Sequence, residues 1–388
     1  MSDSNRLALS YEKEGATYGT APASALEDVR FTGESLVPTT NAVSSTEIRS
    51  DRQIPDVTRV AIGAGGDTNH EFSYSEFDDW LESALLSATW IAEVAGLENS
   101  QTTSVGSGDG IYTIGASTWS TTPAVGDILE IRGDAQAGNN GYKVVTAATT
   151  TTITVAQTGT TTSAAQTLVI DNLGSIKNGV TFASYHLQKE YEDLTTTFQL
   201  MTGMFIEGLS IEAALEGLVT MTFNWIGKSA TSPAPTSTFA ARNGTTTNEI
   251  FNTVDHIPVT GQGATLANLD LTNFTMALAN NSRQLNELGA LGAQDIGLGH
   301  VDVTGTIQMY FEDSTIMNLY TGNTATELIV VFEDTLGNGY VFYLPQIKLT
   351  AGASTAGSQD SDIIGDFSYI AYRDATLDYT LKIARFTA

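Results

Sequence analysis

Residues 70–86, HEFSYSEFDDWLESALL, run from a short alternating segment through an acidic turn into an amphipathic segment. This order predicts a strand that ends at Tyr74 and a short helix with Ser75 as its N-cap. The acidic side chains that follow Ser75 would lie in the first turn, where the helix dipole favours negative charge. The apolar residues recur with helical spacing and predict one buried face, made of Phe77, Trp80, Leu81, Ala84 and Leu85.

Residues 300–320, HVDVTGTIQMYFEDSTIMNLY, repeat this order 230 positions later. Glu312 and Asp313 would open a second short helix that ends at Gly322. We interpret both acidic clusters as helix starts rather than as catalytic carboxylates. The apolar face of the preceding strand is predicted to consist of Val301, Val303, Ile307, Met309 and Phe311. The apolar side of the helix is predicted to consist of Ile316, Leu319 and Tyr320.

More of the pattern recurs in the same order. SDRQI at residues 50–54 and NSRQL at residues 281–285 each follow a strand-like segment and precede a Gly-rich loop. Each half then closes with a strand, a turn and further alternating strands. The sequence therefore predicts an all-β, mainly antiparallel fold, in which two tandem β-sandwich domains each carry a short flanking α-helix.

Composition divides the chain further. Residues 1–28 are polar and loosely patterned, which predicts an N-terminal arm. Residues 97–172 are rich in Thr, Gly and Ala, with short alternating runs that predict a small inserted β-domain. The remaining parts are a first tandem domain (29–96 with 173–228), a Ser/Thr/Pro-rich linker (229–248) and a second tandem domain (249–388).

The 388-residue chain has a formal net charge of −27 and no cysteine. The excess of carboxylates disfavours binding to phosphates, and the lack of cysteine excludes disulfides and thiolate chemistry. No nucleophile elbow, phosphate-binding loop, secretion signal or membrane span is readable. We therefore expect a soluble, unsecreted chain that is not an enzyme and has no cofactor or metal site. The histidines are isolated in the sequence and are interpreted as structural: His70, His186, His256 and His300.

Arginines gather in one polar stretch. Arg49, Arg52 and Arg59 lie close together in the sequence, with Asp51 and Asp56 among them. Such a stretch is either an ordinary solvated loop or a loop that pairs with an acidic neighbour, a task that suits the arginine fork. The overall acidity is likewise open to two interpretations: it serves solubility alone, or it provides a surface that must not hold DNA.

Several segments, taken in order, resemble the tail tube proteins of long-tailed, siphovirus-type bacteriophages. Within residues 97–172, VGDILEIRGDAQAGNNGYKVVTA (125–147) resembles an extra β-domain that some of these proteins carry. The segments that carry the main resemblance are FTGESLVPTTNAVSSTEIRSDRQIPD (31–56), EFSYSEFDDWLESALLSATW (71–90), residues 189–228, VDVTGTIQMYFEDSTIMNLY (301–320) and YLPQIKLTAG (343–352).

The resemblance implies a structural virion protein that polymerises as stacked rings. In such proteins the inner sheets of a ring join into one continuous barrel, and DNA passes through the lumen. The stacking loop would be residues 36–66, with Arg49, Arg52 and Arg59, and its counterpart residues 278–299, with Arg283. Simple members of the family assemble six copies per ring. A doubled chain would need three, which predicts trimeric, pseudo-hexameric rings, with a hexamer as the alternative.

The resemblance also implies partners and a location. The tape measure protein and the phage DNA would occupy the lumen without sequence-specific binding. Tail tip and tail terminator proteins would bind the ends of the tube. The protein would be assembled in the host bacterial cytoplasm and reside in the virion, with an acidic lumen and with the insert on the outer wall. The alternative from another class is a surface-exposed β-domain adhesin or decoration protein that forms no tubes.

Overall fold

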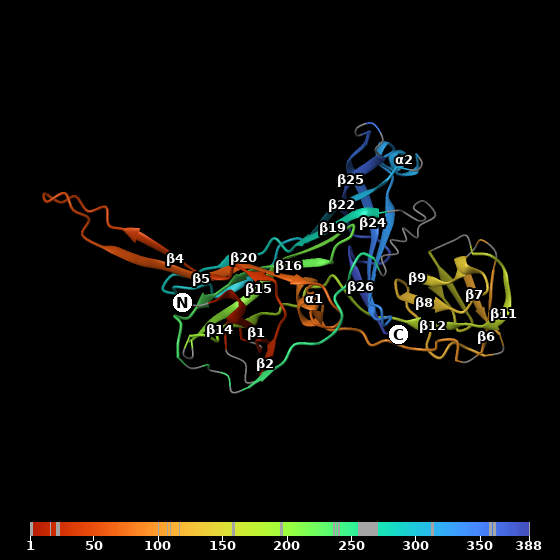
Figure 1. The fold of residues 1–388 in the computed structure, drawn as a ribbon, viewed down its shortest axis with the longest axis horizontal. Helices are drawn as coiled ribbons and strands as arrows, with labels where there is room; N and C mark the ends of the chain where they lie inside the picture. The colour runs from red at the N-terminus through yellow and green to blue at the C-terminus, as the bar shows by residue number, and fades with distance from the viewer. Residues whose placement is uncertain are drawn as a thin grey trace.

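The computed structural model describes residues 3–15, 17–20, 24–99, 101–106, 108, 110–115, 117–156, 160–194, 197–235, 237, 239, 241–254, 271–311, 314–356, 359 and 362–387. His256, Glu312 and Asp313, named above, lie outside these residues. The described chain is built almost entirely of antiparallel strands, with two short α-helices, so the predicted fold class is confirmed (Figure 1).

The strands form three groups along the chain. The first half contains β1 (Leu7–Lys13), β2 (Leu26–Asp28), β3 (Gly33–Glu34), β4 (Val37–Ser44), β5 (Val57–Glu71), β13 (Gly174–Lys177), β14 (Tyr185–Tyr191), β15 (Thr197–Ala214), β16 (Thr220–Gly227), β17 (Ser229–Ala230) and β18 (Arg242–Asn243). The second half contains β19 (Leu271–Ala279), β20 (Arg283–Leu285), β21 (Asp295–Gly297), β22 (Asp302–Tyr310), β23 (Thr326–Glu333), β24 (Gly339–Ala356), β25 (Ile363–Ala371) and β26 (Lys382–Phe386). The insert contains β6 (Thr102–Val105), β7 (Ile111–Ile114), β8 (Ile128–Arg132), β9 (Gly141–Ala148), β10 (Thr152–Val155), β11 (Ser163–Thr167) and β12 (Val169–Asn172).

One continuous sheet crosses both halves in the order β4–β5–β16–β15–β19–β22–β25–β24, and all neighbours are antiparallel. The pairing order is the same in the two halves: β5–β16–β15–β14 in the first and β22–β25–β24–β23 in the second. The strands β15 and β24 are both 18 residues long. Each carries a register shift near its middle, between Ile206 and Gly208 and between Leu349 and Ala351, because each passes from the outer layer into the shared sheet.

Two glycines occupy corresponding places in these sheets. Gly66 of β5 lies opposite Trp225, and Gly305 of β22 lies opposite Tyr369. A Cβ atom on Gly66 would lie 2.4 Å from the carbonyl oxygen of Ser35, and one on Gly305 would lie 2.1 Å from that of Thr275. Neither position has room for a side chain, so both halves need glycine at this place in the strand.

The helices occupy corresponding places as well. α1 (Asp78–Ala84) packs against β15, and α2 (Thr315–Thr321) packs against β24. Short 3-10 turns lie at Ser4–Arg6 and Ala137–Asn139. The predicted apolar faces are confirmed. Phe77, Trp80 and Leu81 are fully buried, and Leu319 is 4% exposed. Phe311 follows β22 and packs against the edge of the same core.

The prediction that Ser75 caps the first helix is wrong. Helix α1 begins after Phe77, which makes no side-chain capping bond, and Ser75 has a left-handed φ of 57°. The backbone N–H of Ser75 donates to the Tyr340 hydroxyl at 2.9 Å instead. A contact with the second half of the chain therefore sets the turn before the helix, which local capping rules could not reveal. Gly322 is the C-cap of α2 as predicted, with a right-handed φ of −79°.

The N-terminal segment also differs from the expectation. Residues 7–13 form β1, which pairs with β14 over its whole length and buries Leu9 and Tyr11. This part of the expected arm is thus a strand of the sandwich, because its alternating apolar residues face the core.

A single apolar core joins the two halves. At their boundary Phe72 stacks on Tyr340 with ring centroids 5.2 Å apart, and Phe251 packs against both rings. The two tandem units therefore share aromatic surface and form one body.

The insert forms its own seven-stranded sheet, in the order β11–β6–β7–β10–β9–β8–β12. The insert follows α1 in the sequence, but it packs on the second half, beside β26 and the C-terminus (Figure 1). Val144 of the insert shares a cluster with Val331 and Phe386. The Lys382 ammonium donates to the carbonyl oxygen of Gly126 at 2.9 Å and lies 3.2 Å from the Asp127 carboxylate. The insert is thereby fixed against the second half by apolar packing and a partly buried charge pair.

Candidate functional site

The strands β4 and β5 form a hairpin that leaves the body of the protein as a long arm (Figure 1). Every residue from 37 to 60 is exposed. The hairpin closes where the N–H of Ser45 donates to the carbonyl oxygen of Asp56 at 2.9 Å. Much of the segment expected to be a long loop is therefore paired strand, including the Gly-rich residues 61–67.

The arm carries apolar side chains that contact no core. Ile48 at its tip is 100% exposed. The other exposed large apolar residues of the arm are Val37, Val43, Ile54, Val57 and Val60. An isolated two-stranded hairpin is only marginally stable in water. Exposed apolar side chains on such a hairpin favour binding to another protein surface. The arm is therefore a candidate binding surface.

The predicted charged residues lie at the tip of this arm. The Arg49 guanidinium contacts the Asp51 carboxylate at 3.1 Å and, together with the N–H of Gln53, lowers the pKa of Asp51. The Asp56 carboxylate accepts from the Thr58 hydroxyl at 2.8 Å. Among the described residues, Arg52 at the tip and Arg59 in β5, opposite Ala42, form no ion pair, so their guanidinium groups remain available.

The counterpart loop of the second half lies at the root of the arm, away from its tip. Arg283 belongs to the small hairpin β20–β21, where its side chain covers Gly297. The N–H of Ile62 in β5 donates to the carbonyl oxygen of Leu291 at 2.9 Å, which ties this loop to the arm. The structure thus brings Arg49, Asp51, Asp56 and their neighbours together and leaves Arg283 apart from them. Three large apolar residues of the loop are exposed: Leu285, Leu288 and Leu291.

The second candidate surface is the open face of the shared sheet. Residues on this face alternate with the core residues, and most of them are small and polar. They form cross-strand pairs: the Thr275 and Thr306 hydroxyls are 2.8 Å apart, and Asn224 donates to Asp67 at 2.7 Å. The ionisable groups of the face are Asp67, Glu71, Glu212, Asp302, Asp366 and Lys348.

The face is therefore acidic as well as polar, with five carboxylates and one ammonium group among these ionisable residues. None of these carboxylates was singled out from the sequence. The period-two alternation could have placed them opposite the buried strand residues, but the strand order that brings them onto one face is not a local property.

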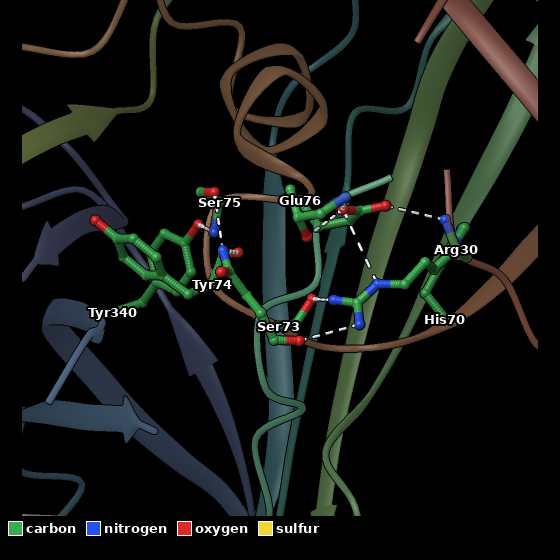
Figure 2. A network of polar contacts seen from close by, with 9 residues as sticks. Arg30, His70, Ser73, Tyr74, Ser75, Glu76 and Tyr340 are labelled. Carbon is green, nitrogen blue, oxygen red and sulfur yellow. Dashed lines mark hydrogen bonds and ion pairs between the residues drawn. The ribbon is translucent and has the colours of Figure 1, made fainter. Parts of the chain in front are cut away.

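A polar network joins the two halves of the chain (Figure 2). Glu76, 7% exposed, accepts from the N–H of Arg30 at 3.0 Å and from the N–H of Thr246 at 2.9 Å. Tyr340 donates to Asp78 at 2.5 Å while it accepts from Ser75, as described above. The first half, the segment expected to be a linker and the second half thus share one set of hydrogen bonds, which fixes their relative position.

The described histidines are held by structural contacts. His70 Nδ1 lies 2.6 Å from the carbonyl oxygen of Arg30, which makes it the donor, and burial lowers the pKa of His70 to about 4. His186 Nδ1 lies 2.6 Å from the buried Glu14 carboxylate. His300 lies 3.1 Å from Asp302 at the surface.

The Glu14 carboxylate is buried and accepts several hydrogen bonds. Burial opposes its ionisation, but hydrogen bonds from His186 and Ser184 and from the N–H groups of Gly203 and Gly19 lower the pKa of Glu14. No group of three or more His, Asp or Glu side chains gathers as metal ligands in the part of the chain that the structure describes. Neither described helix is long and apolar enough to span a membrane.

The antiparallel fold, the exposed apolar arm and the open acidic sheet face fit the class of all-β structural proteins. The family model for phage tail tube protein matches residues 4–380, and the chain belongs to this family. Comparison with curated proteins gives no match. The resemblance to phage tail tube proteins is confirmed. The chain is a structural component of a bacteriophage virion, a tail tube built from copies of one protein.

The environment of His70 predicts a pH dependence of stability. The unfolded chain binds a proton at His70 near the ordinary pKa of 6.5, whereas the folded chain does so only near pH 4. Stability is therefore lost as the pH falls through this window, by roughly 2–3 kcal/mol between pH 7 and 4.5. Urea unfolding of wild type and His70→Phe should show this extra loss in wild type only. His300→Phe, at an exposed histidine, is the control, and parallel curves for wild type and His70→Phe would contradict the assignment.

Proposed function

We propose that copies of this chain form closed rings that stack head to tail, and that the lumen of the resulting tube conducts DNA into the host. The observation that carries the proposal is the exposed arm with its unpartnered apolar side chains. The eight residues of β4 alone span about 25 Å, and the arm extends further to its tip. An arm of this reach can cross from one ring onto the next, a heterologous contact that continues without limit along one axis.

Each ring would contain three copies. Single-domain tube proteins present six units per ring, and this chain carries two units with the same pairing order. Three copies would then present six similar sheets to the lumen in a pseudo-hexameric ring. The division into two tandem domains supports this count, with a first domain at 29–96 and 173–228 and a second at 249–388. A hexamer of the doubled chain would leave twelve units in the ring.

The open acidic face would line the lumen. DNA carries one negative charge per about 1.7 Å of its axis, so a basic wall would hold it. A wall of small polar side chains and carboxylates repels the duplex weakly from all sides and lets it slide. The tape measure protein would fill the same space before ejection, and tail tip and terminator proteins would close the ends.

The insert would lie on the outer wall. It packs against the second half on the side opposite the open face, through the cluster of Val144, Val331 and Phe386. In this position the insert would serve only to thicken the wall of the tube. Assembly in the bacterial cytoplasm and a non-contractile tail complete the proposal.

The arm provides the direct test of stacking. Ile48→Asp with Ile54→Asp places two charges on exposed apolar side chains outside the core, so folding should be unchanged. Electron microscopy of the concentrated protein should show tubes for wild type and only single rings or free protein for the variant. Val180→Asp with Leu336→Asp, two exposed apolar residues off the arm, should form tubes like wild type.

Normal tubes from the arm variant would contradict stacking through the arm. Failure of wild type to form tubes, even on preformed tail tips, would favour the adhesin or decoration class.

The lumen charge predicts a change in DNA retention. Glu212→Lys with Asp366→Lys converts two exposed carboxylates of the open face into cations. Tubes assembled from this variant with a short DNA duplex should keep duplex that nuclease cannot reach, and raised salt should release it. Wild-type tubes should keep little. Glu192→Lys with Asp378→Lys, off this face, is the control, and equal protection by both variants would exclude the proposed lumen.

A further inference from the structure

Two edges of the shared sheet lack strand partners among the described residues. One edge is formed by residues 33–39, in β3 and β4, which pair only with β5. The other is formed by residues 351–355 of β24, which pair only with β25. The side chains at this second edge are small, since the sequence there is AGAST. Unpaired edges are templates for the addition of another strand.

The junction between the two halves shows how such edges can meet. Strand β15 pairs with β19 in antiparallel register, and Ser210 lies opposite Ala277. This junction joins the end of the first unit to the start of the second. The free edges are the start of the first unit and the end of the second, so a second copy of the chain can repeat the junction.

Rows of residues paired across the strands show which positions of the two halves correspond, and this gives the expected register between two copies. In the first half one row runs Ser210, Thr222, Asn69 and Gly33. In the second half the corresponding row is Ala353, Asp366, Gln308 and Asn273.

Ala353 therefore occupies the place of Ser210, and Gly33 that of Asn273. Ala277 follows Asn273 by four residues, as Val37 follows Gly33. Because Ser210 faces Ala277 within the chain, Ala353 of one copy should face Val37 of the next.

At the edge of the first unit that has no strand partner, side chains of the same chain bind the outward backbone groups. The N–H of Ser35 donates inward to Asp67 at 2.9 Å, so the N–H and carbonyl of the next residue, Leu36, point outward. Both outward groups are occupied: the Glu34 carboxylate accepts from the Leu36 N–H at 2.8 Å, and the Lys189 ammonium donates to the Leu36 carbonyl at 2.6 Å.

This pair is itself an ion pair, with 2.6 Å between Lys189 and Glu34, and Lys189 is only 5% exposed. The corresponding residues of the second half are Phe274 and Val330, which lie within or against the core. That edge is covered permanently by β15. The polar pair thus occurs where the edge is free and is replaced by apolar residues where the edge is filled.

We propose that residues 351–355 of one copy add to residues 35–39 of the next in the register of the β15–β19 junction, and that Glu34 and Lys189 close this edge until then. The inference rests on the proposed function, whose rings require such a contact. An N–H donates one full hydrogen bond, so Glu34 must release Leu36 before the carbonyl of Ser354 can bind there. Pro38, the next outward residue, has no N–H to offer, which further protects the edge in the free chain.

Cross-linking tests the register. Val37 and Ala353 would form a non-hydrogen-bonded pair, the closest kind in an antiparallel ladder, and a disulfide can span it. The chain has no cysteine, so Val37→Cys with Ala353→Cys introduces the only thiols. Mild oxidation of the assembled variant should give a denaturant-resistant ladder that ends at closed rings of three copies.

Val37→Cys with Ala351→Cys is the matched control. Its thiols would be diagonal neighbours, with Cα atoms about 7–8 Å apart, and should cross-link poorly. Tubes from the first variant without cross-links, or preferential cross-linking of the control, would overturn the register and leave the proposed function standing. Absence of tubes from the wild-type chain would overturn both.

The closing pair is tested by assembly kinetics. Glu34→Ala with Lys189→Met removes both charges together and frees the outward groups of Leu36. The lag before tube growth should shorten roughly tenfold, since a hydrogen bond to a charged group is worth at least that factor. Arg6→Met with Glu192→Ala, which removes an exposed ion pair away from any free edge, should leave the lag unchanged. An unchanged or longer lag in the Glu34/Lys189 variant, with the fold intact by circular dichroism, would contradict the closing role.

Discussion

Backbone hydrogen-bonding groups at the edge of a sheet need partners, and this constraint organises the whole molecule. The β15–β19 junction meets it once within the chain, where the two halves join into a continuous sheet. The network of Arg30, Glu76 and Tyr340 holds the halves in the geometry that keeps this junction closed. Among the described residues, side chains bind the outward backbone groups of Leu36 at one outer edge, and residues 351–355 at the other edge pair only with β25.

The open face, the arm and the insert are each placed by the shared sheet. A sheet with a buried face and an open face separates an apolar core from a polar surface, and here that surface carries carboxylates. The arm projects away from the sheet and presents exposed apolar side chains. The insert packs on the side opposite the open face, so it adds mass there without covering that face.

Local patterns in the sequence predicted the fold class and the buried faces, because periodicity follows directly from which side of an element meets the core. Phe77, Trp80 and Leu81 are buried as their spacing predicts. The misses are non-local. Ser75 faces Tyr340, 265 residues away, and no capping rule contains that contact. The pairing of Glu34 with Lys189, the position of the insert on the second half and the gathering of carboxylates on one face all depend on strand order, which periodicity does not encode.

The central claim is that one chain supplies two equivalent units to a ring. End-on class averages of assembled tubes by electron microscopy test it most directly, because the insert marks each copy once on the outside. Three outer protrusions around an inner wall of six similar units are the expected result. Six outer protrusions, or an inner wall without sixfold repetition, would contradict it.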